Sequence, residues 1–140
     1  ALVTLSRVAV PYMHKTIAAH KLDGRVSCVH VVDETMEEEA LDPQFGEPAA
    51  YLARFAAACR LAVREGAQAV VPAEGMMAAL IVTNGVRAVD RCPIVDPVAA
   101  AILQAEFAVR MQRATGLAQS RLAYPLPSAA SMATFFGAAQ

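Results

Sequence analysis

A single acidic residue stands where a buried strand is expected to run into a helix. Residues 67–71 have the apolar, β-branched character of a buried strand, residues 75–82 that of a short apolar helix, and Glu74 falls between them. The first backbone N–H groups of such a helix favour anions, which suits a substrate carboxylate or a developing enolate. The alternative is a plain turn, in which Gly75 supplies backbone freedom and Glu74 complements the helix dipole.

Two hydroxyl residues follow the first expected strand, at the same edge of the sheet. A hydroxyl at Thr4 or Ser6 is placed to hydrogen-bond a ligand carboxylate, although a helix N-cap explains Ser6 at least as well. Asp96 precedes Pro97 at the expected start of a long helix, so its role as an N-cap outweighs a catalytic role. His30 is expected inside the second strand, as a core residue with one satisfied nitrogen.

The cysteines and histidines show no spacing typical of a metal site. Cys28, Cys59 and Cys92 form no close pair, and the first two resemble buried small apolar residues. Cys92 precedes an expected strand, at the edge of the sheet opposite to ligand sites. His14 and His20 lie six apart on a helix and do not share a face. We therefore expect no metal, no disulfide framework and a cytoplasmic, reducing compartment.

The composition of the chain limits the kinds of partner that it can bind. The formal net charge is -1 and the pI about 6.3, which argues against nucleic acid or an anionic membrane as a partner. Hydrophobic residues make up 56% of the chain, yet no apolar run reaches the roughly 18 residues of a spanning helix. A parallel sheet buried on both faces explains this high content of hydrophobic residues. The alternative is that some apolar surface contacts a partner. The chain begins directly in a strand-like run without a signal peptide, so we expect upstream sequence in the intact protein.

Strands and helices alternate along the chain. The expected strands are residues 1–5, 25–32, 67–71 and 93–95, and the expected helices are residues 8–22, 49–65, 75–82 and 97–115. This order predicts an α/β fold with a small doubly wound parallel sheet of about four strands in flavodoxin-like order. Residues 1–121 are expected to form this lobe, and residues 122–140 a tail with a short apolar segment around Met132, Phe135 and Phe136.

The ordered segments resemble the C-terminal half of the aspartate/glutamate/hydantoin racemase family. The resemblance runs through nearly the whole chain and is carried by residues 1–4, 63–76 (with Gly66, Ala67 and Gly75), 92–101, 104–106 and 115–121. It implies two similar α/β lobes with the active site between them, of which this chain is the second. Each lobe supplies a cysteine, and the two thiols move a proton on opposite faces of a carbon next to a carboxyl or imide group, without cofactor or metal.

The resemblance also implies a set of ligand-binding residues. Thr4 matches the hydroxyl residue that holds the substrate's carboxyl group, and Ser6 lies where some relatives place a polar group. The family's second cysteine falls at Glu74, and the adjoining substrate-binding positions are Ala73, Gly75 and Met76. The implied partners are a small-molecule carboxylate, amino acid or hydantoin, an N-terminal lobe outside this chain, and further copies in a homo-oligomer.

Glu74 in place of a cysteine changes what this lobe can do. The helix N-terminus favours the charged carboxylate, which weakens it as a base, and its charge repels a substrate carboxylate. Glu74 as the base is therefore the lesser hypothesis, and it predicts that Glu74→Gln abolishes activity. Three functions stay open. The first is an isomerase of the racemase type, or a related decarboxylase or cis–trans isomerase, that uses a cysteine of the other lobe. The second is a catalytically silent small-molecule-binding protein, and the third is an assembly role for the tail around Phe135 and Phe136.

Overall fold

The computed structural model describes residues 1–34, 38–118, 120, 122 and 125–136, and every structural statement below concerns these residues. The chain divides into two compact units, Ala1–Ile102 and Leu103–Gln140, which are described separately. None of the described helices is long and apolar enough to cross a membrane.

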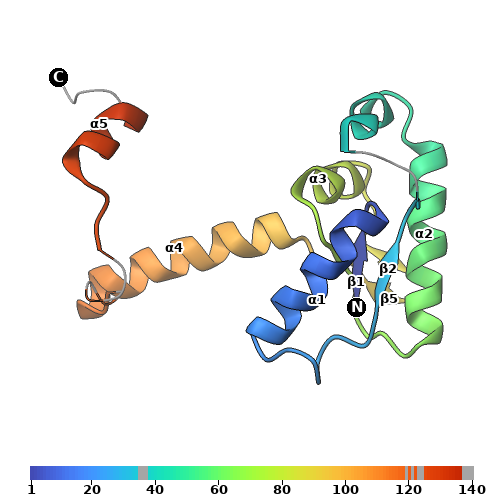
Figure 1. Cartoon of the computed structure of the whole chain (residues 1–140), viewed down its shortest axis with the longest axis horizontal. Coiled ribbons are helices and arrows are strands. Elements are labelled where there is room, and N and C mark those ends of the chain that lie inside the picture. The colour runs from blue at the N-terminus through green and yellow to red at the C-terminus, as the bar shows by residue number, and fades with distance from the viewer. Residues whose placement is uncertain (35–37, 119, 121, 123–124, 137–140) are drawn as a thin grey trace. The chain divides into compact units, whose positions relative to one another are not determined.

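The first unit is built on a parallel sheet of three short strands (Figure 1). The strands are β1 (Leu2–Thr4), β2 (Val29–Val31) and β3 (Val71–Pro72), in the order β2-β1-β3. Val3 of the central strand pairs with His30 on one side and with Pro72 on the other. The expected mixed α/β fold with a parallel sheet is therefore confirmed.

The expected fourth strand contributes only one bridge to this sheet. Ile94 forms an isolated parallel bridge with Val70, and the Val95 N–H donates to the Val70 carbonyl at 2.8 Å. The preceding residues belong instead to an antiparallel hairpin of β4 (Ala88–Val89) and β5 (Cys92–Pro93). Its turn residues Asp90 and Arg91 have φ values of 48° and 67°, the left-handed turn that twisted hairpins favour. Residues 90–91 are not the Asn-Gly or Asp-Gly pair that is typical of such a turn, so the turn could not be predicted from the sequence.

Four helices agree closely with the expected segments: α1 (Val10–Ala19), α2 (Ala49–Arg64), α3 (Gly75–Thr83) and α4 (Pro97–Thr115). The structure also has a helix α5 (Ala129–Phe136) in the expected tail, and 3-10 turns η1 (Arg7–Ala9) and η2 (Glu38–Phe45). Pro11 lies in the first turn of α1, where no N–H is needed. Gly66 ends α2 with a φ of 88°, a conformation that glycine adopts without steric cost.

The core of the first unit lies between the sheet, α2 and α3. The buried residues of α2 are Tyr51, Phe55, Ala58, Cys59 and Ala62, and those of α3 are Met77, Ala78, Leu80 and Ile81. The helical spacing of Leu52, Phe55, Ala56, Cys59 and Val63 predicts that these residues form the buried face of α2. Phe55 and Cys59 are buried, whereas Leu52, Ala56 and Val63 are only partly buried against this core. Ala58 and Ala62 are buried instead, so the buried face is rotated relative to the expected one.

The last long helix has no buried residue. The helical spacing of Val98, Ile102 and Val109 predicts one apolar side of α4, but all three residues are exposed. In the second unit, α5 covers part of the expected apolar segment, and the side chains of Phe135 and Phe136 lie outside the described part of the structure.

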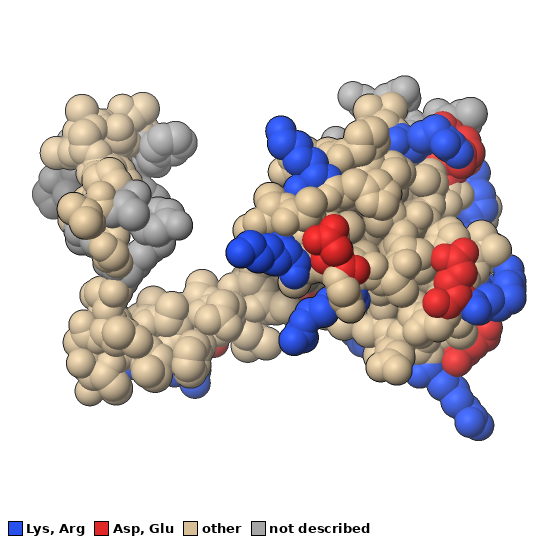
Figure 2. Space-filling model, turned by 60° about the horizontal axis from the view of Figure 1, so that its bottom comes forward, with Lys and Arg blue, Asp and Glu red and all other residues tan. Residues whose placement is uncertain are grey.

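Charged side chains are mixed over the first unit. On the face in view in Figure 2, lysine and arginine side chains alternate with aspartate and glutamate, and neither sign gathers into a single patch. This distribution matches the small net charge of the chain.

Candidate functional site

Two of the residues singled out from the sequence, Thr4 and Glu74, meet at the carboxyl ends of β1 and β3. Thr4 is the last residue of β1, and Glu74 follows β3 by two positions. The two strands are parallel neighbours, so their carboxyl ends share one edge of the sheet. The Thr4 hydroxyl donates a hydrogen bond to Glu74 Oε1, and the Leu5 N–H donates to Glu74 Oε2 at 3.1 Å. Two donors at the carboxyl end of β1 therefore converge on one carboxylate.

The burial of Thr4 makes its hydrogen bond to Glu74 important for the stability of the fold. Thr4 has no exposed surface, and a buried hydroxyl is costly without a hydrogen-bond partner. Glu74 supplies that partner from a half-buried position. The pair thus links the ends of two strands through one side-chain contact.

Glu74 occupies the N-cap position of α3 but does not cap it. Its backbone is extended, with φ -115° and ψ 143°, and its side chain makes no cap hydrogen bond. The carboxylate turns back toward β1 instead of toward the N–H groups of its own helix. Ala73 anchors the junction through its N–H, which donates to the Val3 carbonyl at 2.8 Å, while Gly75 and Met76 are exposed in the first helical turn.

The glycine after Glu74 is not required by the backbone. The described glycines with positive φ are Gly66, Gly85 and Gly116, and Gly75 is not among them. A Cβ placed on Gly75 would meet only Val98 Cγ2, at an ordinary 3.9 Å. The expectation that Gly75 supplies backbone freedom is therefore wrong.

Gly75→Ala is expected to raise the free energy of unfolding by about 0.5 kcal/mol, because alanine restricts the unfolded chain and fits the helical conformation. Gly66→Ala is the matched control and should lower it by about 1 kcal/mol, since its φ of 88° strains any side chain. Urea denaturation of both variants measures the difference. A loss of stability in Gly75→Ala as large as that in Gly66→Ala would contradict this account.

Tyr51 brings a buried hydroxyl to the same region. Its side chain has no exposed surface, and its phenol oxygen has no hydrogen-bond partner among the described residues. Burial raises the pKa of Tyr51, the negative charge of Glu74 raises this pKa further, and Arg54 opposes the rise. The phenol and the Glu74 carboxylate therefore interact within one poorly solvated region.

An ion pair lies at the carboxyl end of the neighbouring strand, β2. Arg54 follows Tyr51 by three positions on α2, and its Nη1 lies 2.9 Å from Asp33 Oδ2. The Asp33 N–H donates to the Leu5 carbonyl at 3.1 Å, which places Asp33 beside the end of β1. We refer to Thr4, Asp33, Tyr51, Arg54 and Glu74 together as the carboxyl-edge cluster.

The other candidates have simpler roles. The Val98 and Ala99 N–H groups both donate to Asp96 Oδ1 at 3.0 Å, which confirms Asp96 as the N-cap of α4. Ser6 stands before η1 without a side-chain cap hydrogen bond, so the expected capping bond is absent. His30 Nε2 lies 3.2 Å from Glu65 Oε2 without hydrogen-bond geometry, so this nitrogen is not the satisfied one that was expected.

Sequence reasoning missed the contributions of Asp33, Tyr51 and Arg54. The available signal was the spacing of Tyr51 and Arg54, because side chains three apart on a helix are neighbours. A tyrosine on an otherwise apolar helix face also brings one polar atom into the core, and that atom needs a partner.

Comparison of the chain with protein-family models, with curated proteins and with solved structures finds no match.

Proposed function

We propose that this chain is a racemase-type lobe that binds a small molecule at the carboxyl edge of its sheet, as part of a cofactor-independent isomerase. One observation carries the proposal: the Thr4 hydroxyl and the Leu5 N–H converge on a single point between the ends of β1 and β3. Glu74 occupies that point from the start of α3.

The strand order supports a ligand site at this point. In an open parallel sheet, ligands bind outside the carboxyl ends of the strands, where the strand order reverses direction. The order β2-β1-β3 reverses between β1 and β3, and Ile94 bridges to Val70 beyond them. We propose that this order continues into a flavodoxin-like, doubly wound sheet, whose switch point would fall between Thr4 and Glu74.

The hydrogen bonds favour a binding role for Glu74. A carboxylate that already accepts bonds from Thr4 and Leu5 is suited to accept another from a ligand, not to act as a free base. Its negative charge attracts N–H groups and repels a second carboxylate. We therefore propose that the ligand presents an N–H to Glu74, as a hydantoin imide or an amino-acid ammonium group does.

The proton transfer itself is assigned to the other lobe. A thiolate there would remove the proton from the carbon next to the carboxyl or imide group, so that the C–H bond breaks and an S–H bond forms. The thiol then returns a proton, to the same carbon or to another position of the ligand. Thr4 and Glu74 would hold the ligand against this thiol, and a homo-oligomer of such two-lobe subunits is part of the proposal.

Ligand titration of the chain, followed through its backbone amide NMR signals, tests the binding site. A 5-substituted hydantoin should shift the amide signals of Leu5, Gly75 and Met76, and succinate, a dicarboxylate without an N–H group, should bind at least about tenfold more weakly because of the Glu74 charge. Thr4→Val should weaken hydantoin binding, whereas the control Thr83→Val, whose hydroxyl bonds only its own helix, should not. Equal shifts with succinate, or none with either ligand, would overturn the proposal.

A catalytically silent binding protein is the second candidate. The observation in its favour is that the Thr4 hydroxyl, which the family resemblance assigns to the substrate, is already bonded to Glu74. Such a protein would bind the same N–H-bearing ligand without exchanging the hydrogen on its α-carbon.

A further inference from the structure

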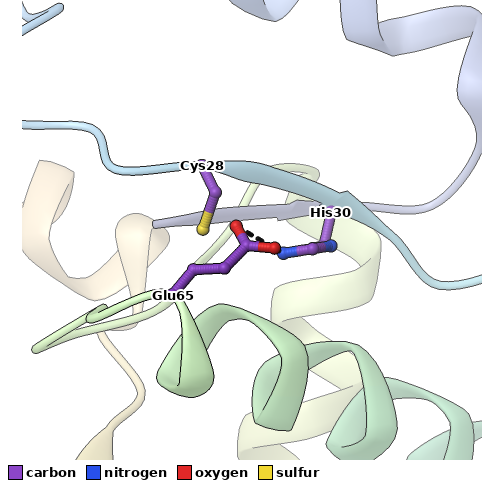
Figure 3. Close-up of side chains that lie close together, drawn as sticks. All are labelled: Cys28, His30 and Glu65. Carbon is purple, nitrogen blue, oxygen red and sulfur yellow. Dashed lines mark ion pairs between the residues drawn. The ribbon is translucent and has the colours of Figure 1, made fainter.

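We propose that Cys28, His30 and Glu65 form a binding site for a divalent transition-metal ion of the zinc class. Each residue offers one ligand atom, and these sulfur, nitrogen and oxygen atoms all lie within 4.8 Å of one another (Figure 3). Thiolate, imidazole and carboxylate are the three protein ligands that Zn²⁺ takes most often.

The fold brings these ligands together from two elements. Cys28 and His30 are two positions apart on an extended segment, so their side chains share one face of the sheet. The Leu2 N–H donates to the Cys28 carbonyl at 3.1 Å, which extends the strand pairing back to Cys28. Glu65 is the C-cap residue of α2, which runs alongside β2 in Figure 1. The positive φ of Gly66 ends the helix directly after this ligand.

The distance between the imidazole and the carboxylate suits a metal ion. Two ligands bound at about 2.0–2.1 Å in a tetrahedral site are about 3.4 Å apart. His30 Nε2 and Glu65 Oε2 are separated by 3.2 Å, close to that value. The Nε2 atom is shielded from solvent and makes no hydrogen bond within the described residues. Binding an ion would satisfy this buried nitrogen, as buried polar atoms require.

The order of the three groups argues against a nucleophilic cysteine. In Figure 3 the Glu65 carboxylate lies between the Cys28 sulfur and the His30 ring. A catalytic thiol needs its base within hydrogen-bond reach, and here a carboxylate separates the two. A metal ion instead uses all three groups at once, from one centre.

The site is accessible and separate from the carboxyl-edge cluster. Cys28 precedes β2 and Glu65 lies at the end of α2, so the proposed metal site is on the amino-terminal side of the sheet. Ser27 Oγ lies 3.5 Å from Cys28 Sγ, and Ser27 and Gly66 line a cavity of about 260 Å³. Glu65 is also exposed, which leaves an approach for the ion and a position for water as a fourth ligand. The ion would join the end of α2 to β2.

Titration of the metal-free chain with Co²⁺ and Zn²⁺ tests this site. One equivalent of Co²⁺ should give the visible absorption of a tetrahedral complex and a thiolate-to-metal charge-transfer band, both displaced by Zn²⁺. Cys28→Ala should remove the charge-transfer band. Glu65→Gln, at an exposed position that does not threaten folding, should weaken Zn²⁺ binding at least about tenfold.

His14→Gln and Glu47→Gln are the matched controls, because both residues are exposed and away from the cluster. They should bind both ions as tightly as the unchanged chain. A charge-transfer band that persists in Cys28→Ala would overturn the proposal, and so would equal affinities for the unchanged chain and Glu65→Gln, or no binding of either ion.

Discussion

Glu74→Ala is expected to lower the free energy of unfolding by about 2 kcal/mol. The substitution leaves the Thr4 hydroxyl, which has no exposed surface, without the carboxylate that accepts its hydrogen bond. An unsatisfied buried polar group costs about 1–3 kcal/mol, and hydrogen bonds to charged groups contribute at the upper part of that range. Urea denaturation at neutral pH measures the loss.

A double-mutant cycle isolates the Thr4–Glu74 contact from other effects of the substitution. Thr4→Val alone should destabilise the chain by about 1–2 kcal/mol, whereas in the Glu74→Ala background it should be neutral or stabilising, because the orphaned hydroxyl is removed. Thr83→Val should have the same effect in both backgrounds, since its hydroxyl bonds the carbonyl of Ala79. Additive losses for Thr4→Val and Glu74→Ala would show that the two residues do not interact.

Tyr51→Phe is expected to raise the free energy of unfolding by about 1 kcal/mol and to weaken ligand binding. The phenol oxygen is buried without a partner among the described residues, so removing it relieves a desolvation cost. The ring, which fills the core beside Phe55, is retained. If a ligand at the carboxyl edge is the partner of this hydroxyl, Tyr51→Phe should raise the free energy of unfolding and lower the affinity for the ligand at the same time. A stability loss in Tyr51→Phe would contradict this interpretation.

The same substitution should change the alkaline stability of the chain. Because burial and the charge of Glu74 raise the pKa of Tyr51 above 10 in the folded state, the unfolded chain ionises this phenol first as the pH rises above 10. The free energy of unfolding therefore falls as the pH rises above 10. Burial likewise raises the pKa of Cys59 from 9.0 to about 12, which gives a loss that begins near pH 9. Denaturation between pH 8 and 11 should show a smaller alkaline loss in Tyr51→Phe, with the Cys59 part unchanged.

The elements that position the carboxyl edge could be predicted from the sequence, because their signals are local. The β-branched run before His30, the glycine after α2 and the Asp96-Pro97 pair each act within a few residues. Thr4 and Glu74 could be placed at one sheet edge for the same reason, since each follows an expected parallel strand. Their direct hydrogen bond could not be predicted, because it depends on the side-chain orientation at the α3 N-cap.

Other features depend on tertiary contacts that periodicity does not encode. Tyr51, Ala58 and Ala62 are on the buried face of α2, whereas the apolar pattern placed Leu52 and Ala56 there. The β4–β5 hairpin depends on left-handed conformations at Asp90 and Arg91, which these residue types adopt only in context.

The Cys28, His30 and Glu65 cluster lay beyond prediction for a related reason. Spacing rules search for ligands within one segment, and no pair of cysteines or histidines here fits them. The third group comes from the end of a helix far along the chain, and only the packing of α2 beside β2 brings it to the strand.

The most direct test of the proposed isomerase is incubation of the protein with both lobes and a 5-substituted hydantoin in D₂O, followed by NMR of the α-carbon hydrogen. The account predicts that deuterium replaces this hydrogen without added cofactor, that Thr4→Val slows the exchange, and that Glu74→Gln retains it at saturating ligand. Absence of exchange would contradict the assignment as an isomerase and leave the silent binding protein. Loss of exchange in Glu74→Gln at saturating ligand would show that Glu74 is the base and not the residue that holds the ligand.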